Sequence, residues 1–433
     1  MPAETSTFAT SAARSRSLHV LGVVCGLTAG VWLAAAEAPT KFVMAGISPF
    51  VISLGMVCGV FVARWTLPTI LKGTAYVFRD LRESSHLIVW AFLAGAMWSV
   101  ANTLSIFAIR DVGLEIAFPL WNTASLVGLF WGCLFFRELR GAGLTVWMKV
   151  LGGGIAIVAG ALLLSLATSR GTSAEAARAA RGIAAALGAA ALWGTMFSTY
   201  RKAYISGMNP LSFVTIFTFG ELITMALLAF TFDGGLRPVL RNIHDGKQAL
   251  FWLFLGGFFW VIGDLFAQYG AKYIGIGRTV PLMCTNQLWG LAWGALVFGE
   301  LAGQVFVSRA LVIVGSGVMA LGALAVSTAV APNSEYFSRR EATRRECDRY
   351  SLDLERIEAG LTGNDLLAAE VTGRKWWDGL IVALAVGIFI LLLTMTSVPP
   401  FSFHMGWTVV LTIIMLASLF GCGYLLWKQT HFS

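Results

Sequence analysis

One part of the sequence occurs twice, and this internal repeat limits the folds open to the chain more than any other feature. Residues 118–141 read FPLWNTASLVGLFWGCLFFRELRG and residues 280–303 read VPLMCTNQLWGLAWGALVFGELAG, with 13 of 24 positions identical. The offset of 162 residues also holds upstream, where Trp98 aligns with Trp260, and it becomes 161 nearer the N-terminus. A repeat of this length indicates that one structural unit is present twice.

The repeated unit is strongly apolar. Hydrophobic residues make up 57% of the chain and charged residues only 12%, with a mean hydropathy of +0.75. A soluble chain needs far more charge to cover its surface, so the composition predicts an all-α protein that crosses the lipid bilayer many times. The chain has a net charge of +8. Basic residues in a membrane protein usually lie in the loops that set its orientation, so we expect no nucleic-acid partner. The six cysteines are isolated, so we expect neither a disulfide framework nor a metal site, and no cofactor.

Spanning helices need about 20 mostly apolar residues, and the sequence contains them as five, five and then two segments. The predicted spans are 18–36, 48–66, 87–108, 115–136, 144–168, 182–203, 209–230, 249–271, 277–299, 304–329, 377–397 and 406–427. The predicted organisation is a cytoplasmic tail (1–17), a first five-helix repeat (18–168), a connecting loop (169–181), a second repeat (182–329), a charged cytoplasmic linker (330–375) and two additional spans (376–433).

The odd number of helices in each repeat predicts that the two copies enter the membrane from opposite sides. Such inverted repeats can pack in two equivalent ways around a central site, which is the physical basis of alternating access. The distribution of Lys and Arg over the predicted loops, with Arg64 counted among them, favours both termini in the cytoplasm.

A polar stripe on the predicted eighth span is the first candidate site. Asp264 lies four residues after Trp260 and four before Gln268, so the three side chains share one helix face. Asn102, which aligns with Asp264, lies four residues after Trp98 in the same way. A lone charge inside a span costs at least roughly 2.5–3.5 kcal/mol, so we expect these residues to bind substrate and Asp264 to couple an ion. A satisfied hydrogen bond between helices is the structural alternative.

A second acid and a second pair of helices complete the candidate site. Glu221 also falls inside a span and is the other candidate for ion coupling. The fourth and ninth spans each carry a proline near their start, followed by Trp121 and Asn122 in one and by Asn286 and Gln287 in the other. Proline interrupts helical hydrogen bonding and can free carbonyls toward a cavity, so we expect these four residues to bind substrate. No catalytic motif is present, and we expect no enzyme activity.

The stretch GLEIAFPLWNTASLVGLFWGCLFFRELRG resembles the drug/metabolite transporter superfamily, whose ten-helix members carry two EamA-like repeats. The resemblance covers about 18–329 and includes the Lys41, Ser48-Pro49 and Arg64 spacing of the first-to-second-helix connection. Within the superfamily, the LWNT, GLFWG and FFRE segments are most similar to the glucose/ribose and rhamnose porter branch. The resemblance implies a secondary carrier with a central cavity lined by both repeats.

These observations favour a transporter that moves a small polar solute, foremost a sugar or polyol, across the cytoplasmic (inner) membrane of a bacterium. Aromatic rings can stack on the apolar face of a pyranose, while amides and a carboxylate bind its hydroxyls. We expect coupling to a proton, with sodium as the alternative ion. An exporter of drugs, amino acids or other metabolites is the nearest rival, and a non-transporting membrane scaffold or sensor is another. The last two spans could mediate a homodimer or shield the core.

Overall fold

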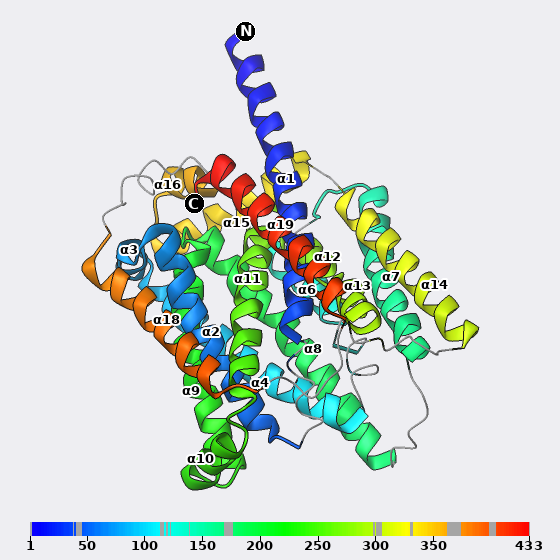
Figure 1. Cartoon of the computed structure of the whole chain (residues 1–433). Coiled ribbons are helices and arrows are strands. Elements are labelled where there is room, and N and C mark those ends of the chain that lie inside the picture. The colour runs from blue at the N-terminus through cyan, green and yellow to red at the C-terminus, as the bar shows by residue number, and fades with distance from the viewer. Residues whose placement is uncertain are drawn as a thin grey trace.

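The structure is a computed structural model of the whole chain. It describes residues 2–37, 39, 46–112, 117, 120–121, 123–137, 139–168, 176–297, 299, 305–329, 332–361, 374–397 and 404–432. Every regular element in these residues is a helix, and none is a strand. The elements that form the bundle in Figure 1 are α1 (Pro2–Glu37), α2 (Pro49–Lys72), α3 (Ala75–Glu83), η2 (Ser85–Leu87), α4 (Ile88–Val112), α6 (Ala124–Phe136), α7 (Leu144–Thr168), α8 (Ala176–Ile205), α9 (Pro210–Phe232), α10 (Leu236–Asp245), α11 (Leu250–Ile274), α12 (Ile276–Met283), α13 (Asn286–Ala292), the π-helical turn η3 (Trp293–Val297), α14 (Phe306–Ser327), α15 (Pro332–Tyr350), α16 (Leu354–Leu361), α18 (Trp376–Met395) and α19 (Met405–Thr430).

Ten helices in the described part of the chain are long and apolar enough to cross a membrane. The all-helical architecture predicted from composition is therefore confirmed, and the ten helices are compatible with a chain that crosses the membrane many times. These helices are α1, α2, α4, α7, α8, α9, α11, α14, α18 and α19. The tail predicted for residues 1–17 is helical from Pro2 onward and continuous with the first span, because no glycine or further proline interrupts the sequence before Gly22.

The predicted fourth and ninth spans are not continuous long helices in the described residues. The fourth contributes only α6, of 13 residues, and the ninth is divided into α12, α13 and η3. Pro281 provides no N–H, and a turn at Cys284 and Thr285 follows it. The Thr285 hydroxyl donates to the Leu282 carbonyl at 2.7 Å, and the Thr123 hydroxyl donates to the Leu120 carbonyl at 2.6 Å. At each interruption a threonine hydroxyl thus donates to the carbonyl three residues earlier, and the two threonines lie 162 residues apart.

Glycines bring the central helices into backbone contact. A Cβ on Gly59 of α2 would lie 2.0 Å from the Phe254 carbonyl oxygen of α11, and one on Gly257 would lie 1.9 Å from the Met56 carbonyl oxygen. The α4 and α9 helices cross in the same way, since a Cβ on Gly95 or Gly220 would lie 2.1 Å from a carbonyl oxygen of the opposite helix. Small residues allow such close approach in membrane proteins.

The glycine contacts recur at the offset of the sequence repeat. Gly59 and Gly220 are 161 residues apart, and Gly95 and Gly257 are 162 apart. The contact between α7 and α14 follows the same rule. Gly153 meets the Gly322 carbonyl, and Gly160 meets the Gly315 carbonyl. Gly153 and Gly315 are 162 residues apart, as are Gly160 and Gly322.

The charged linker and the last two helices pack around this core. In the linker, α15 and α16 are helical, and they contact the core through ion pairs. These pairs are Lys202–Glu346 at 3.1 Å, Arg137–Glu341 at 2.8 Å and Arg356–Glu83 at 2.6 Å. The α18 helix packs on α2 and α19 packs on α1. Ser17, near the start of the first span, donates to Gln429 near the end of α19 at 3.0 Å, so both ends of the chain reach the same end of the bundle (Figure 1).

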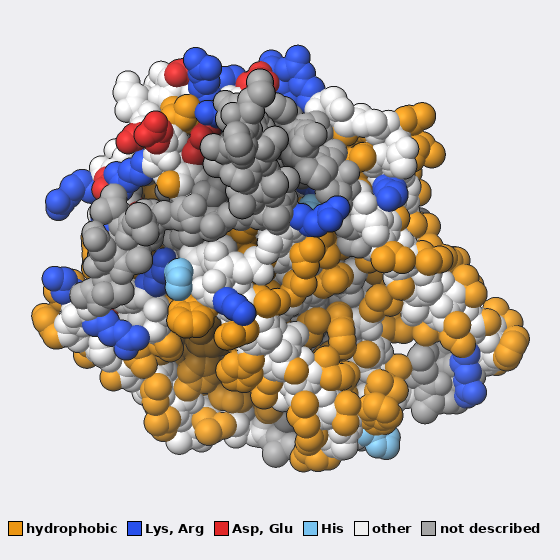
Figure 2. All heavy atoms as spheres, turned by 90° about the horizontal axis from the view of Figure 1, so that it is seen from above, with side chains coloured by type: hydrophobic (Ala, Val, Ile, Leu, Met, Phe, Trp, Pro, Cys, Tyr) orange, Lys and Arg blue, Asp and Glu red, His pale blue; other side chains and the backbone are white. Residues whose placement is uncertain are grey.

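Charged side chains gather at this end of the molecule. Figure 2 views it from above and shows blue Lys and Arg side chains, with red Asp and Glu among them, beside wide areas of orange apolar side chains. An apolar periphery is what a helix bundle presents to lipid, where no hydrophobic penalty opposes its exposure.

Candidate functional site

A buried ion pair lies between α2 and α11. The Arg64 Nη2 donates to Asp264 Oδ2 at 2.8 Å, and the two side chains are 0% and 1% exposed. Two further groups donate to the same carboxylate, the Gln268 amide at 2.5 Å and the Tyr200 hydroxyl at 3.4 Å. The Tyr204 hydroxyl in turn donates to Oε1 of the Gln268 side chain. Asp264 therefore accepts from three donors, one of them charged, which suits an ionised carboxylate.

The local sequence explains how Arg64 comes to be buried. The α2 helix continues through Pro68 to Lys72, because the residues after Arg64 are again mostly apolar. The close crossing at Gly59 and Gly257 then draws α2 toward α11 over the turns that precede the ion pair. The pair is therefore positioned by a rigid backbone contact rather than by a loop.

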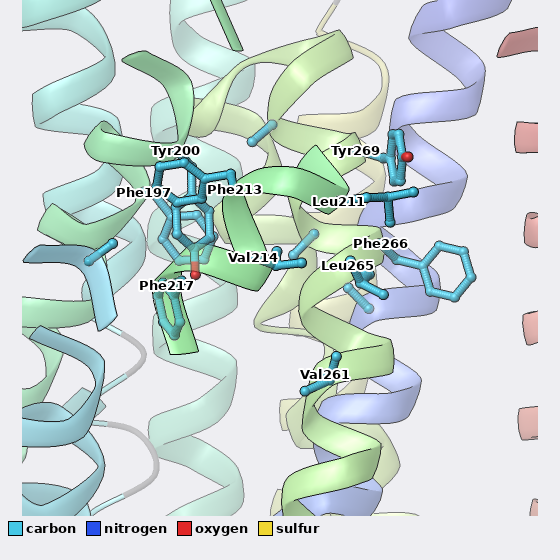
Figure 3. Close-up of a cluster of buried hydrophobic side chains, with 14 of the residues drawn as sticks. Phe197, Tyr200, Leu211, Phe213, Val214, Phe217, Val261, Leu265, Phe266 and Tyr269 are labelled. Carbon is cyan, nitrogen blue, oxygen red and sulfur yellow. The ribbon is translucent and has the colours of Figure 1, made fainter. Parts of the chain in front are cut away.

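Aromatic rings enclose the guanidinium. The Arg64 Cζ lies 4.1 Å from the centroid of the Phe217 ring and 5.2 Å from that of Trp260. Trp260 meets Trp98 edge to face, with ring centroids 4.7 Å apart. Figure 3 shows Tyr200 and Phe217 together with further aromatic side chains of α8 and α9. Such rings attract a cation, and they close the guanidinium off from bulk solvent in this conformation, since Arg64 is 0% exposed.

Glu221 of α9 stands beside the ion pair. Its side chain is 0% exposed, and neither carboxylate oxygen has a hydrogen-bond partner in the part of the chain that the structure describes. Arg64 and Asp264 are the charged groups that act on it. Its backbone carbonyl accepts from the Ser99 hydroxyl of α4 at 2.7 Å, in the contact where α4 crosses α9. A buried carboxyl group without donors is unusual and marks a candidate for proton binding.

Asn102 belongs to a neighbouring polar cluster rather than to the ion pair. Its amide donates to the Ser53 hydroxyl at 2.8 Å, and Ser53 and Thr103 are 3.3 Å apart. This cluster joins α2 and α4, and the three polar side chains are buried. The hydrogen-bond alternative considered from the sequence therefore describes Asn102 in this conformation.

The structure brings only part of the predicted set together. Asp264, Gln268, Trp260, Trp98 and Glu221 surround or adjoin Arg64 as described above.

The remaining predicted residues lie elsewhere or outside the description. Trp121 packs edge to face against Trp193, 5.8 Å away between centroids, in a separate apolar cluster. Asn286 and Gln287 lie on α13, which packs against α1. Asn122 lies outside the described residues.

Arg64 is the residue of this candidate site that the sequence did not single out as a binding residue. Counting it with the loops is wrong, because it lies inside the predicted span 48–66, and α2 continues six residues beyond that span to Lys72. A signal was available, since the apolar run continues from Trp65 to Leu71 and places Arg64 within it. The described residues bring no three His, Cys, Asp or Glu side chains together in a way that could hold a metal ion.

Comparisons with known proteins add little to this description. No protein-family model matches the chain, and no curated protein matches it. One solved structure, described only as "Crystal structure of protein", is similar with a TM-score of 0.45 and 17% identity, over 70% of this chain and 96% of that chain.

Proposed function

We propose that this protein is a secondary transporter of the drug/metabolite type, which carries a small polar solute across the membrane by alternating access. The observation that carries the proposal is the cluster of Arg64, Asp264 and Glu221, buried where apolar spans cross. Ionisable groups are costly inside a membrane, and where they occur they mark substrate or ion pathways. A scaffold or sensor would have no need of three such groups in its core.

The direction of the chain supports an inverted arrangement of the two repeats. Gln429 and Phe432, at the end of α19, contact Ser17 near the start of the first span and Asn209, just after the end of α8. The first helix of one copy therefore begins at the end of the bundle where the first helix of the other copy ends. The recurring glycine contacts are consistent with a two-fold relation of this kind.

This arrangement makes a labelling prediction. Single cysteines at Ser85 and Lys247, both exposed and 162 residues apart at equivalent positions of the two copies, should react with a membrane-impermeant maleimide from opposite sides of the membrane. Reaction of both from one side would contradict the inverted arrangement. With the linker inside the cell, the cysteine at Ser85, close to the Glu83 that pairs with Arg356 of the linker, should be the one protected in intact cells, and both termini should also be cytoplasmic.

A sugar or polyol remains the substrate that we favour. Trp98 and Trp260 provide aromatic faces. Asn102 lies one helical turn from Trp98 on α4, and its amide is hydrogen-bonded to the Ser53 hydroxyl of α2. Opening of the contact between the two tryptophans would expose a surface with apolar and hydrogen-bonding parts, which suits a sugar. An exporter of amphipathic metabolites would use the same surface, so the substrate must be tested directly.

Uptake into proteoliposomes tests the proposal. Purified protein should accumulate one class of labelled solute when an inward proton gradient is imposed, and the panel should contain sugars, polyols, amino acids and cationic drugs. Asp264→Asn should abolish gradient-driven accumulation, whereas Glu355→Gln, an exposed control, should retain it. Full accumulation by the Asp264→Asn variant would contradict a coupling role for this acid. Absence of transport for every class would contradict the proposal itself.

A further inference from the structure

We infer that the buried cluster holds one proton between its two acids, that Glu221 carries this proton in the present conformation, and that Arg64 is the single countercharge that the described residues offer to either acid. The inference rests on the proposed function only for the use made of the proton. The protonation state itself follows from the contacts, and it can be measured without knowledge of the substrate.

The contacts of Asp264 are those of an ionised carboxylate. Arg64, Gln268 and Tyr200 all donate to it. A protonated acid would place its own O–H against one of these donors, and the Arg64 guanidinium would lose the anion that balances it. Because arginine stays charged in proteins, ionised Asp264 is the arrangement that leaves this pair neutral.

The surroundings of Glu221 require the opposite state. Its side chain is fully buried, and no described group donates to either oxygen. The titratable or charged groups that act on it from the neighbouring helices are Arg64 and Cys58 of α2, Tyr200 of α8 and Asp264 of α11. From α4, the Ser99 hydroxyl donates to its backbone carbonyl and not to the side chain. An ionised carboxylate without donors is so costly in a site closed to solvent that the group takes up a proton instead.

The free donors of Arg64 show how the proton could move. Its Nε and Nη1 are buried and have no hydrogen-bond partner among the described residues. A shift of α9 relative to α2 would let these N–H groups reach Glu221, which would release its proton to water as its oxygens accept them. Asp264, losing Arg64, would then take up a proton from water. One arginine, two carboxyl groups and one proton are present before and after, so the core stays neutral in both conformations.

Infrared spectroscopy of the purified full-length protein in lipid tests this inference without any ligand. Wild-type protein at neutral pH should show the carbonyl stretch of a buried protonated carboxyl group. Glu221→Gln should lose this band, while the exposed control Glu355→Gln should keep it. Arg64→Met should strengthen the band, because Asp264 loses its countercharge and becomes protonated as well.

Three outcomes would overturn the inference. Absence of the band in the wild type would mean that both acids are ionised, and its persistence in Glu221→Gln would place the proton elsewhere. Labelling the side-chain carboxyl of glutamate, and separately of aspartate, with ¹³C identifies the residue type that carries the proton in the wild type, should the variant fail to fold. A band that shifts with labelled aspartate and not with labelled glutamate would overturn the inference. None of these results depends on whether the protein transports a solute.

Discussion

The double substitution Asp264→Asn with Glu221→Gln should destabilise the protein much more than the two single substitutions predict. It removes both carboxyl groups that act on Arg64 and leaves a guanidinium that cannot lose its proton. In Asp264→Asn alone, Glu221 can ionise and balance the charge. In Glu221→Gln alone, the ion pair with Asp264 is intact and glutamine has the size of a protonated glutamate.

The magnitudes follow from the geometry. At the 2.8 Å separation of the ion pair, an effective dielectric constant of about 20 gives an attraction of roughly 6 kcal/mol. Desolvation of the two charges offsets part of this, and removal of one partner from a buried pair costs about 3–5 kcal/mol. We therefore expect the double variant to lose about 3–5 kcal/mol of its free energy of unfolding. Asp264→Asn, which loses hydrogen bonds to a charged group, should lose about 1.5–3 kcal/mol, and Glu221→Gln should lose very little.

Reversible unfolding in mixed micelles, followed by tryptophan fluorescence, measures these losses. The double variant should exceed the sum of the single variants by about 1–2 kcal/mol, within the range found for residues that interact directly. Adding Arg64→Met to the double variant should recover most of the loss, since no charge then remains. Simple additivity of the single variants would refute the idea that one arginine serves two acids.

Two other predictions concern helix packing. Gly59→Ala should lower the free energy of unfolding by about 1–3 kcal/mol in the same assay, because its Cβ would overlap the Phe254 carbonyl oxygen. The control Gly152→Ala, where a Cβ meets nothing within 4 Å, should be neutral or slightly stabilising. Equal effects of the two substitutions would contradict the close crossing. Cys25 and Cys422, whose sulfur atoms are 3.6 Å apart, should form a disulfide under a membrane-permeable oxidant. A protease site inserted between residues 362 and 373 would then allow the chain to be cut between these two cysteines. The disulfide should hold the two fragments together until it is reduced. Separation without reductant would place α19 away from α1.

The sequence predicts much of this architecture because its signals are local. A repeated apolar pattern requires membrane-spanning helices, and a spacing of four residues places Trp260, Asp264 and Gln268 on one face. The structure confirms this stripe, since Gln268 donates to Asp264 within α11. The polar face of a single helix is visible in its own sequence, whatever its partners are.

The partners of these helices are not visible in the same way. Arg64 lies 200 residues from Asp264, and no periodicity within α2 shows which helix it faces. The continuation of α2 past Pro68 also depends on neighbours, because packing against other helices can satisfy the carbonyl that proline leaves free. Trp121 shows the converse, since its place in the repeat predicts a binding site, whereas the structure packs it edge to face against Trp193 in a cluster separate from the ion pair.

The positions at which the two copies of the repeat differ are the strongest argument that the charges serve a function. The glycine crossings recur at equivalent positions, at Gly59 with Gly257 between α2 and α11 and at Gly95 with Gly220 between α4 and α9. The charged groups do not recur: Asp264 aligns with an asparagine, Glu221 with a valine and Arg64 with Met225. Where α4 crosses α9, Met225 takes the place of Arg64 and its sulfur accepts from the Thr103 hydroxyl at 3.5 Å, and the helices still pack closely. Because this crossing forms without an ion pair, packing does not require the Arg64–Asp264 pair where α2 crosses α11, and the cost of that pair in a membrane is explained by what it binds.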